Sequence, residues 1–416
     1  MENQFFYPNI QWNVASKFLL RFTFIFFVLL WILPIFQFLD MEIVPWIGTH
    51  ILRLKNPIDI FPNGSGDTTF NYVELLFLVF VSGLVALGWS FFNRSVKAND
   101  RIMHYFMIFT RYFLAYSLLD YGYAKIFYNQ FGEPALSTLL EPYGESSPMG
   151  IAWNFIGASK PYTMYAGIAE FIAGLLLLFR RTTALGALIG FVVMLNVMVL
   201  NYCYDIPVKI YSTQLVVMSL VVLYFKGKNL VNVLITHKPA EARTFKPLFE
   251  NKWLKISRMV LKGSFIFYFV FFNCYKQYAT VEMYGPAAPK APLYGIYKPT
   301  QMIRNNDTLR LFSDSAEWKN LVIEYQGYAM IHQLNERAGW LHFEVDTLNH
   351  SVVTYSQKDT LNKDILNYKF LNDSIMQLKG VYKKDTINFT FNKINLKSFD
   401  LINRGFHWVN EYPYNK

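Results

Sequence analysis

Seven long apolar runs constrain what this chain can fold into more than any other feature of its sequence. Each is close to the length of about 20 residues that a helix needs to cross about 30 Å of hydrocarbon. The runs lie near residues 17–39, 70–92, 103–125, 162–180, 183–204, 208–225 and 258–277. Because lipid offers no hydrogen-bond partners to backbone N–H and C=O groups, we expect each run to be a helix, and the sequence predicts seven membrane spans.

The composition agrees with a membrane protein. Of the 416 residues, 53% are hydrophobic and 18% are aromatic, whereas only 16% are charged. Proportions of this kind are typical of chains whose helices face lipid rather than water. The lipid bilayer is therefore the first partner that we expect.

Basic side chains gather in alternate connections between the runs, which predicts the orientation of the chain. They are Lys17, Arg21, Arg94, Lys97, Arg101, Arg180, Arg181, Lys226, Lys228, Lys238, Arg243, Lys246, Lys252, Lys255 and Arg258. Connections rich in Lys and Arg remain in the cytoplasm, so the amino terminus is expected inside and the region after the seventh run outside. Much of the net charge of +10 then fixes the orientation of the chain in the membrane. No nucleic-acid partner is needed to explain it, and none is expected.

The chain after about residue 290 has a different pattern. Segments such as "NLVIEYQG", "GWLHFEVD" and "TINFTFNKI" alternate apolar and polar residues, and turn sequences such as Asn372-Asp373 separate them. This alternation with a period of two predicts antiparallel strands in a sandwich or small barrel, large enough for its own core. A Pro-rich stretch at 284–295 precedes it as an extended spacer.

These patterns divide the chain into five regions. We expect an N-terminal two-span region, a four-helix membrane core, a cytoplasmic loop, a seventh span, and a spacer with an extracytoplasmic β-domain. Their predicted bounds are 1–102, 103–226, 227–257, 258–283 and 284–416. Residues 128–162, between the third and fourth runs, are too apolar for a solvated loop, and Gly and Pro interrupt them too often for a span. Two short interfacial helices are expected there.

Two residues of opposite charge lie inside the runs. Burial of a charge in a membrane costs free energy, so such residues normally face a partner or a cavity. Arg111 lies about nine residues from the inner end of the third run, and Glu170 lies about ten residues from the inner end of the fourth. Their equal depth predicts a buried ion pair. The residues that flank Glu170 at helical spacing are small, so a neighbouring helix can approach: Ala166, Gly167, Ala173 and Gly174. Such a pair can pin two helices, or it can serve as a proton relay or substrate anchor.

A second polar group lies near the outer ends of the third, fifth and sixth runs. Its members are Asp120, Tyr121, Lys125, Asn201, Asp205 and Lys209. We interpret them as a candidate substrate-binding pocket that is open to the outside. The alternative is an ordinary turn between the fifth and sixth runs, in which Asp205 caps the following helix and Lys209 lies one turn further on.

Several cofactors have no matching motif in the sequence. His104 is the only histidine near a run, which leaves a membrane haem without facing ligands. The chain has no CxxC, HExxH or glycine-rich phosphate loop, and no metal site is expected. The cofactor remains unknown, with a quinone as one candidate. Cys203 and Cys274 are expected near the outer face, where a disulfide is permitted, although chance also explains their placement.

Residues 103–226 resemble the DoxX-like family of bacterial multi-pass membrane proteins. The segments that carry the resemblance are "RYFLAYSLLDYGYAKIF", "YAGIAEFIAGLLLLFRRTTALGALIG" and "LNYCYDIPVKIYS", in which Arg111, Gly122, Lys125, Glu170 and Asp205 match the family pattern. The resemblance implies a four-helix core in the bacterial inner (cytoplasmic) membrane. Some family members are subunits linked to thiosulfate:quinone oxidoreductase. This chain departs from the short family form by two added N-terminal spans, a seventh span and the β-domain.

Two classes of function follow from these observations. In the first, the bundle is a redox-associated protein, such as an oxidoreductase subunit, that binds a quinone or a small sulfur compound at the outer polar group. In the second, it is a non-catalytic scaffold or permease that presents residues 290–416 to an envelope or redox protein. The sequence alone leaves both open, and with them the question of whether the chain is an enzyme.

Overall fold

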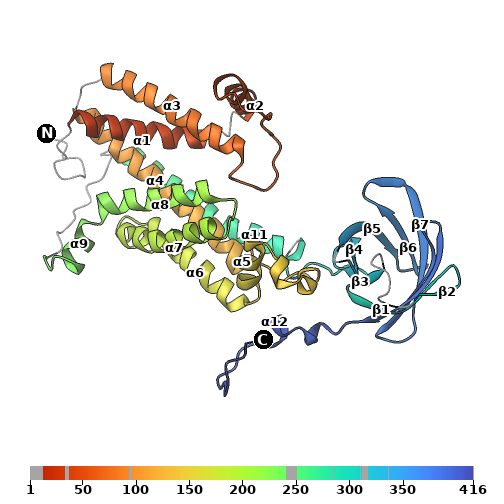
Figure 1. Ribbon diagram of the computed structural model, residues 1–416. Helices are drawn as coiled ribbons and strands as arrows, with labels where there is room; N and C mark the ends of the chain where they lie inside the picture. The colour runs from red at the N-terminus through yellow and green to blue at the C-terminus, as the bar shows by residue number, and fades with distance from the viewer. Residues whose placement is uncertain are drawn as a thin grey trace. The chain divides into compact units, whose positions relative to one another are not determined.

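The computed structural model of the chain describes residues 13–32, 37–92, 96–239, 251–283, 285–309, 311, 317–335 and 337–415. The chain forms two compact units (Figure 1). The helical unit comprises Met1–Phe127 and Met164–Tyr278, and the barrel unit comprises Tyr128–Thr163 and Ala279–Lys416. The chain therefore passes between the units three times, at residues 127–128, 163–164 and 278–279.

Helices cover all or most of the seven apolar runs. The main elements are α1 (Val14–Ile32), α2 (Gln37–Trp46), α3 (Thr69–Phe92), α4 (Val96–Ile126), α6 (Lys160–Leu177), α7 (Thr183–Cys203), α8 (Lys209–Lys226), α9 (Lys228–Leu234), α10 (Lys252–Phe267) and α11 (Asn273–Met283). Two π-helical turns, η2 (Ile47–Ile51) and η5 (Tyr268–Phe272), follow α2 and α10. One apolar core joins residues of α1, α4, α6, α7 and α8, and side chains of α3, α10 and η5 pack against it.

By length and composition, the described residues support three or four membrane spans, not seven. Helices α1, α3 and α7 are long and apolar enough to cross a bilayer, and α8 with α9 makes a fourth if this pair, bent by 74°, is one broken span. The remaining helices are too short or not apolar enough to cross a bilayer by the same criteria. Charged side chains interrupt α4 and α6, and α10 ends after 16 residues at a π-helical turn.

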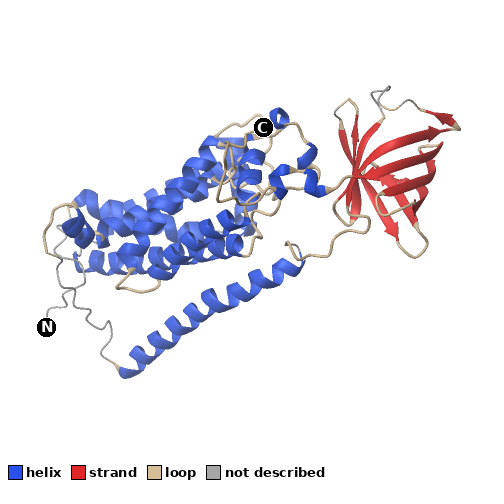
Figure 2. Cartoon of the chain, turned by 90° about the horizontal axis from the view of Figure 1, so that it is seen from below, coloured by secondary structure: helices blue, strands red, loops and turns tan. Residues whose placement is uncertain are grey.

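Eight antiparallel strands close into a barrel, which confirms the predicted β-domain and selects a barrel over a sandwich (Figure 2). The strands are β1 (Gly295–Arg304), β3 (Trp318–Ile323), β4 (Gly327–Gln333), β5 (Ala338–Asp346), β6 (Ser351–Ser356), β7 (Asp359–Phe370), β8 (Ile375–Tyr382) and β9 (Asp385–Lys393). Each strand pairs with the next, and β1 also pairs with β9, with Tyr297 opposite Lys393. The short β2 (Asp307–Thr308) pairs with the end of β1.

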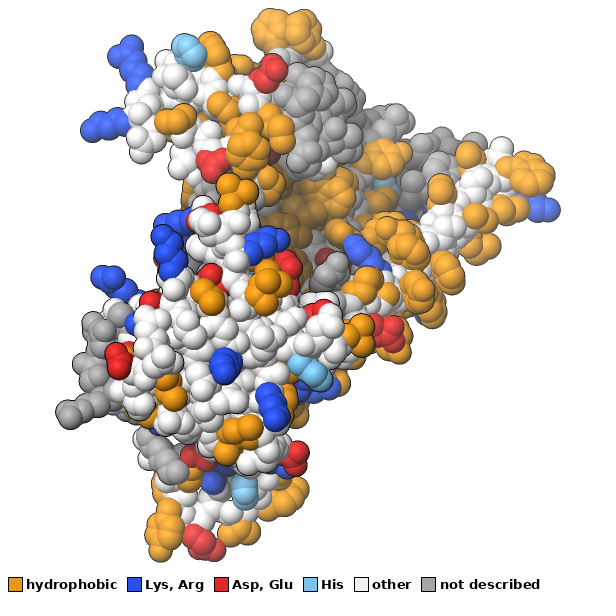
Figure 3. All heavy atoms as spheres, turned by 90° about the vertical axis from the view of Figure 1, so that its right-hand side faces the viewer, with side chains coloured by type: hydrophobic (Ala, Val, Ile, Leu, Met, Phe, Trp, Pro, Cys, Tyr) orange, Lys and Arg blue, Asp and Glu red, His pale blue; other side chains and the backbone are white. Residues whose placement is uncertain are grey.

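Alternate residues of each strand point into the barrel and fill it. On β9, for example, Ile387, Phe389 and Phe391 are buried, and the residues between them are more exposed. These side chains form one core with Tyr297 and Phe343. On the outer face of the barrel that is turned to the viewer in Figure 3, acidic and basic side chains are scattered and the hydrophobic patches are small. The alternation in the sequence therefore identified the two faces correctly.

Residues 128–163 belong to the barrel unit. They form two 3₁₀ turns, η3 (Thr138–Leu140) and η4 (Tyr143–Glu145), and one helix, α5 (Pro148–Gly157), where two short helices were expected. Leu136 packs with Ile296 and Val322 of the barrel. The carboxylate of Glu324, in the β3–β4 turn, accepts a hydrogen bond of 2.8 Å from the backbone N–H of Leu136. This segment is thus fixed to the barrel by both apolar packing and a hydrogen bond.

Candidate functional site

The centre of the helical unit is a close approach between α4 and α6. A Cβ atom added at Gly167 would lie 2.7 Å from the carbonyl oxygen of Gly122, which leaves room for no side chain there. About two turns further along α6, a Cβ at Gly174 would lie 3.0 Å from the carbonyl oxygen of Ala115. The predicted small-residue face of α6 is therefore confirmed, and α4 is the helix that it receives.

Glu170 lies on this same face and forms an ion pair with Lys125. The Nζ atom of Lys125 donates to both carboxylate oxygens, at 2.7 and 2.9 Å. Only 8% of the Lys125 side chain and 2% of the Glu170 side chain are exposed. The buried pair thus joins the C-terminal end of α4 to the middle of α6 with two charge-assisted hydrogen bonds.

The predicted partner of Glu170, Arg111, is not the one that the structure shows. Arg111 precedes Lys125 by 14 positions on the same helix, which is about 21 Å at about 1.5 Å per residue. The depth argument failed because the helix ends are staggered: α4 begins at Val96, and Gly174 lies against Ala115. Glu170 therefore lies beyond the level of Arg111. The buried Arg111 guanidinium lies 4.6 Å from the ring centroid of Tyr112.

Two tyrosines extend this polar site toward α8. The Lys125 Nζ atom lies 5.4 Å from the ring centroid of Tyr121, and the Tyr121 ring lies 5.9 Å from that of Tyr211. The Tyr211 hydroxyl donates to the Ser117 Oγ atom at 2.8 Å. Both rings are only partly buried, so the charged pair is bordered by flat aromatic surfaces that reach the outside of the unit.

Asp120 fixes α4 to the last helix of the unit. Its carboxylate accepts a hydrogen bond of 3.0 Å from the Asn273 side chain, and the Tyr123 hydroxyl donates to the carbonyl oxygen of Val270 at 2.6 Å. Of the predicted pocket residues, Asp120 therefore has a visible structural role. It lies one residue before Tyr121 on α4, at the edge of the Lys125 site.

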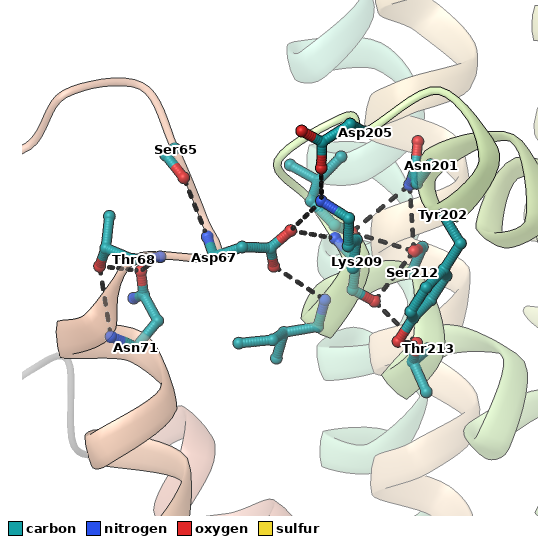
Figure 4. Close-up of polar contacts among 12 residues, drawn as sticks. Ser65, Asp67, Thr68, Asn71, Asn201, Tyr202, Asp205, Lys209, Ser212 and Thr213 are labelled. Atoms are coloured by element: carbon teal, nitrogen blue, oxygen red, sulfur yellow. Dashed lines mark hydrogen bonds and ion pairs between the residues drawn. The ribbon is translucent and has the colours of Figure 1, made fainter. Parts of the chain in front are cut away.

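The other predicted residues form a second cluster at the turn between α7 and α8. Figure 4 shows Asp67 reaching from the loop before α3 to the first turn of α8. Its carboxylate accepts hydrogen bonds from the backbone N–H groups of Lys209 at 2.7 Å and Ile210 at 3.0 Å. The N–H of Gly66 also donates to the carbonyl oxygen of Pro207 at 2.8 Å. Asp67 thus caps α8 from a distant part of the chain.

This finding corrects the prediction that Asp205 caps α8. Asp205 instead accepts a hydrogen bond of 2.8 Å from the Lys209 Nζ atom, and its side chain is 86% exposed. Sequence reasoning missed Asp67 because the cap lies 142 positions from the helix that it serves. The only local signal was an acidic residue in the turn sequence "NGSGDTT", where no basic residue is close.

Asn201 stabilises the same turn. Its side-chain amide donates to the Ser212 Oγ atom at 3.0 Å and to the carbonyl oxygen of Val208 at 3.4 Å. The Lys209 Nζ atom also lies 3.9 Å from the Asp67 carboxylate. Lys125 and Lys209 therefore belong to two clusters, one with Glu170 and one with Asp67 and Asp205. A single pocket that contains both lysines stays a prediction.

Part of the chain is similar to "Uncharacterized protein YwoB" of Bacillus subtilis (strain 168). The two sequences are 37% identical over 136 residues, which cover 84% of YwoB and 32% of this chain. The chain belongs to the family of YwoB. No protein-family model matches the chain, and no solved structure matches it. Because YwoB is described as uncharacterized, membership in its family assigns no activity.

The match to YwoB covers 32% of the chain, so the remaining features rest on the structure alone. In the barrel unit a cavity of about 170 Å³ is bordered by Ala291, Tyr325, Phe343 and Glu344, among others. Pockets for drug-sized ligands usually begin at about 300 Å³. Among the described residues, no group of three or more His, Cys, Asp or Glu could hold a metal ion, and Cys203 and Cys274 are free thiols. The Lys125–Glu170 site is therefore the strongest candidate in the described chain.

Proposed function

We propose that the chain is a DoxX-like integral protein of the bacterial cytoplasmic membrane that binds a small redox-active ligand, a quinone or a small sulfur compound, at Lys125 and Glu170. The observation that carries this proposal is the buried Lys125–Glu170 pair bordered by Tyr121 and Tyr211. Two charges buried in an apolar helical unit are costly, which favours a use for them beyond packing.

The membrane topology is part of the proposal. All seven helical segments contribute to or pack against one apolar core, which favours a single bundle over three spans with separate surface helices. The short and charged helices are then shielded by their neighbours rather than by lipid. With the basic connections inside, the amino terminus is cytoplasmic and the barrel is extracytoplasmic.

The chemistry of the site suits a flat ring with oxygen atoms at its edge. A quinone carbonyl accepts hydrogen bonds, and Lys125 places a charged donor beside the Tyr121 ring. The Tyr121 and Tyr211 rings supply apolar surface beside this donor. A small sulfur oxyanion would instead use the positive charge of Lys125 directly.

The test is ligand retention by the full-length protein. The protein is purified in a neutral detergent, extracted lipids are assayed for quinone, and a water-soluble quinone and thiosulfate are titrated by calorimetry. We expect Lys125→Met and the paired variant Lys125→Met/Glu170→Leu to lose binding. Lys209→Met is the matched control, because it removes a lysine from the Asp67 cluster. If Lys209→Met also loses binding, a single pocket that contains both lysines is supported. If the paired variant binds as well as the wild type, the Lys125–Glu170 site is refuted.

A second candidate function is that of a scaffold that presents the barrel to an envelope or redox protein. It is favoured by a row of neighbouring aromatic rings on the outside of the barrel. Tyr328 of β4, His342 of β5 and Tyr355 of β6 are paired across the strands, with ring centroids 4.7 and 4.4 Å apart. Aromatic rows on a sheet surface are common at protein interfaces.

The two functions are separated by variants of this row. Tyr328→Ser/Tyr355→Ser should leave quinone binding unchanged. If the scaffold is correct, the same variant should lose an envelope protein that co-purifies with the wild type after cross-linking. If the wild type binds quinone and shows no such cross-link, the redox proposal is supported and the scaffold is contradicted.

A further inference from the structure

The first eleven residues of α10 form an amphipathic surface that the functional site does not use. Asn251 caps the helix by accepting a hydrogen bond of 2.9 Å from the N–H of Trp253. The residues 251–261 are all exposed, and the helix packs on the bundle only from Lys262 and Phe265 onward. α10 continues through η5 into α11, and these three elements form the long helical segment that precedes the strands in Figure 2.

The basic residues of this helix lie on one side. At about 100° per residue, Lys252, Lys255, Arg258 and Lys262 fall within an arc of about 120°. No acidic residue occurs in α10. The arc is thus a dense positive surface that no carboxylate of its own helix neutralises.

The opposite side of the helix is apolar. Trp253 is 74% exposed, and Leu261 is 70% exposed. Val260 lies next to Trp253 on this side of the helix, and Ile256 lies at its edge. A helix that exposes Trp and aliphatic residues along one side and cations along the other is suited to the boundary between acyl chains and headgroups.

The position of the helix in the bundle points to one leaflet. Phe265 packs against Tyr112 of α4, with ring centroids 4.9 Å apart, and the Lys262 Nζ atom lies 5.3 Å from the ring centroid of Phe179. Phe179 directly precedes Arg180 and Arg181 in the basic turn after α6. The positive side of α10 therefore begins at the end of the bundle that the proposed topology places in the cytoplasm.

We propose that residues 252–262 form a binding site for the headgroups of anionic phospholipids in the cytoplasmic leaflet. Lys255, Arg258 and Lys262 contact the lipid phosphates, while the Trp253 side of the helix lies among the acyl chains. The opposite charges of the arc and the headgroups select this occupant, and the apolar side favours a lipid over a soluble polyanion. The site depends on the proposed topology only for the choice of leaflet, and it is independent of the ligand at Lys125.

The experiment titrates the full-length protein in neutral detergent with phosphatidylglycerol or phosphatidylcholine of the same acyl chains, and counts bound lipid by native mass spectrometry. We expect the wild type to prefer phosphatidylglycerol. Near an anionic surface each basic residue contributes about fivefold in affinity, so Lys255→Gln/Arg258→Gln/Lys262→Gln should weaken phosphatidylglycerol binding roughly a hundredfold. Phosphatidylcholine binding should hardly change.

The matched control is Lys358→Gln/Lys369→Gln/Lys379→Gln, which removes three exposed charges from the barrel. It should bind phosphatidylglycerol like the wild type, and Lys255→Arg/Lys262→Arg should do the same. If the α10 variant fails to insert, Arg258→Gln alone is measured, with about a fivefold loss expected. Equal binding of the two lipids by the wild type, equal losses in the α10 and barrel variants, or displacement of the lipid by a short RNA or polyglutamate would overturn the proposal.

Discussion

Lys125 and Glu170, 45 positions apart in the sequence, share two hydrogen bonds at the point where α4 and α6 approach most closely. The pair and the close approach depend on each other. Without glycine at 122 and 167 the helices would stand too far apart for the lysine to reach the carboxylate. Without the ion pair, two charges would be buried with no neutralising partner between these helices.

Removal of one charge from this pair should destabilise the protein more than removal of both. We expect Lys125→Met to cost roughly 3–5 kcal/mol, because Glu170 then remains buried without its cation, and Lys125→Met/Glu170→Leu to cost much less. The measurement is thermal unfolding of each variant in the same detergent. Equal melting temperatures for the single and paired variants would mean that the pair carries no such coupling.

A side chain at the close approach should separate the two helices. In Gly167→Ala the new Cβ would lie 2.7 Å from both the Gly122 carbonyl oxygen and the Lys125 Cβ atom, and we expect a loss of about 1–3 kcal/mol. Gly83→Ala is the matched control in α3, where nothing lies within 4 Å of the added atom. That control should be neutral or slightly stabilising, since alanine favours helix over glycine. The prediction fails if both variants melt at the same temperature.

Asp67 should matter more for stability than Asp205, although only Asp205 was expected to cap α8. Asp67→Ala removes two hydrogen bonds to the first turn of the helix and should cost about 0.5–2 kcal/mol. Asp205→Ala removes an exposed carboxylate, and a change within about 0.5 kcal/mol is expected. Thermal unfolding of the two variants side by side checks the order, and a reversed order would contradict the role of Asp67.

The sequence predicted the elements of this fold better than the contacts between them. Apolar length identified the helices, and the alternation of "TINFTFNKI" identified a strand whose buried residues are Ile387, Phe389 and Phe391. Closure of the barrel depends on the pairing of β1 with β9, about 90 positions later, and no local pattern encodes that pairing. Helix stagger is equally non-local, which is why the depth of Glu170 pointed to Arg111 rather than to Lys125. The cap by Asp67 was missed for the same reason.

The orientation of the chain gives a prediction that needs no purified protein. Because the connections rich in Lys and Arg are expected inside, a reporter fused after residue 235 should be cytoplasmic, and one fused after residue 290 should be extracytoplasmic. Paired alkaline phosphatase and fluorescent protein fusions at both positions measure this. If both fusions report the same side of the membrane, the predicted crossing by α10 and α11 is wrong.

The barrel unit should lose stability in alkali through Tyr294. Burial, and then the nearby carboxylates of Glu324 and Glu133, raise the pKa of Tyr294 to about 12, whereas in the unfolded chain the pKa is about 10. The folded state therefore holds the phenol proton more tightly. The stability that this contributes is complete below pH about 10 and is lost as the pH rises from about 10 through about 12.

Thermal unfolding of the full-length protein between pH 9 and pH 12 tests this effect of Tyr294. We expect the melting temperature of the wild type to fall more steeply above pH 10 than that of Tyr294→Phe, in which no phenol can ionise at this position. Tyr143→Phe is the matched control, because Tyr143 lies in the same unit and is 78% exposed. Its pH profile should follow the wild type, since Tyr294 is intact in this variant. Parallel profiles for all three proteins would show that ionisation of Tyr294 is not linked to folding.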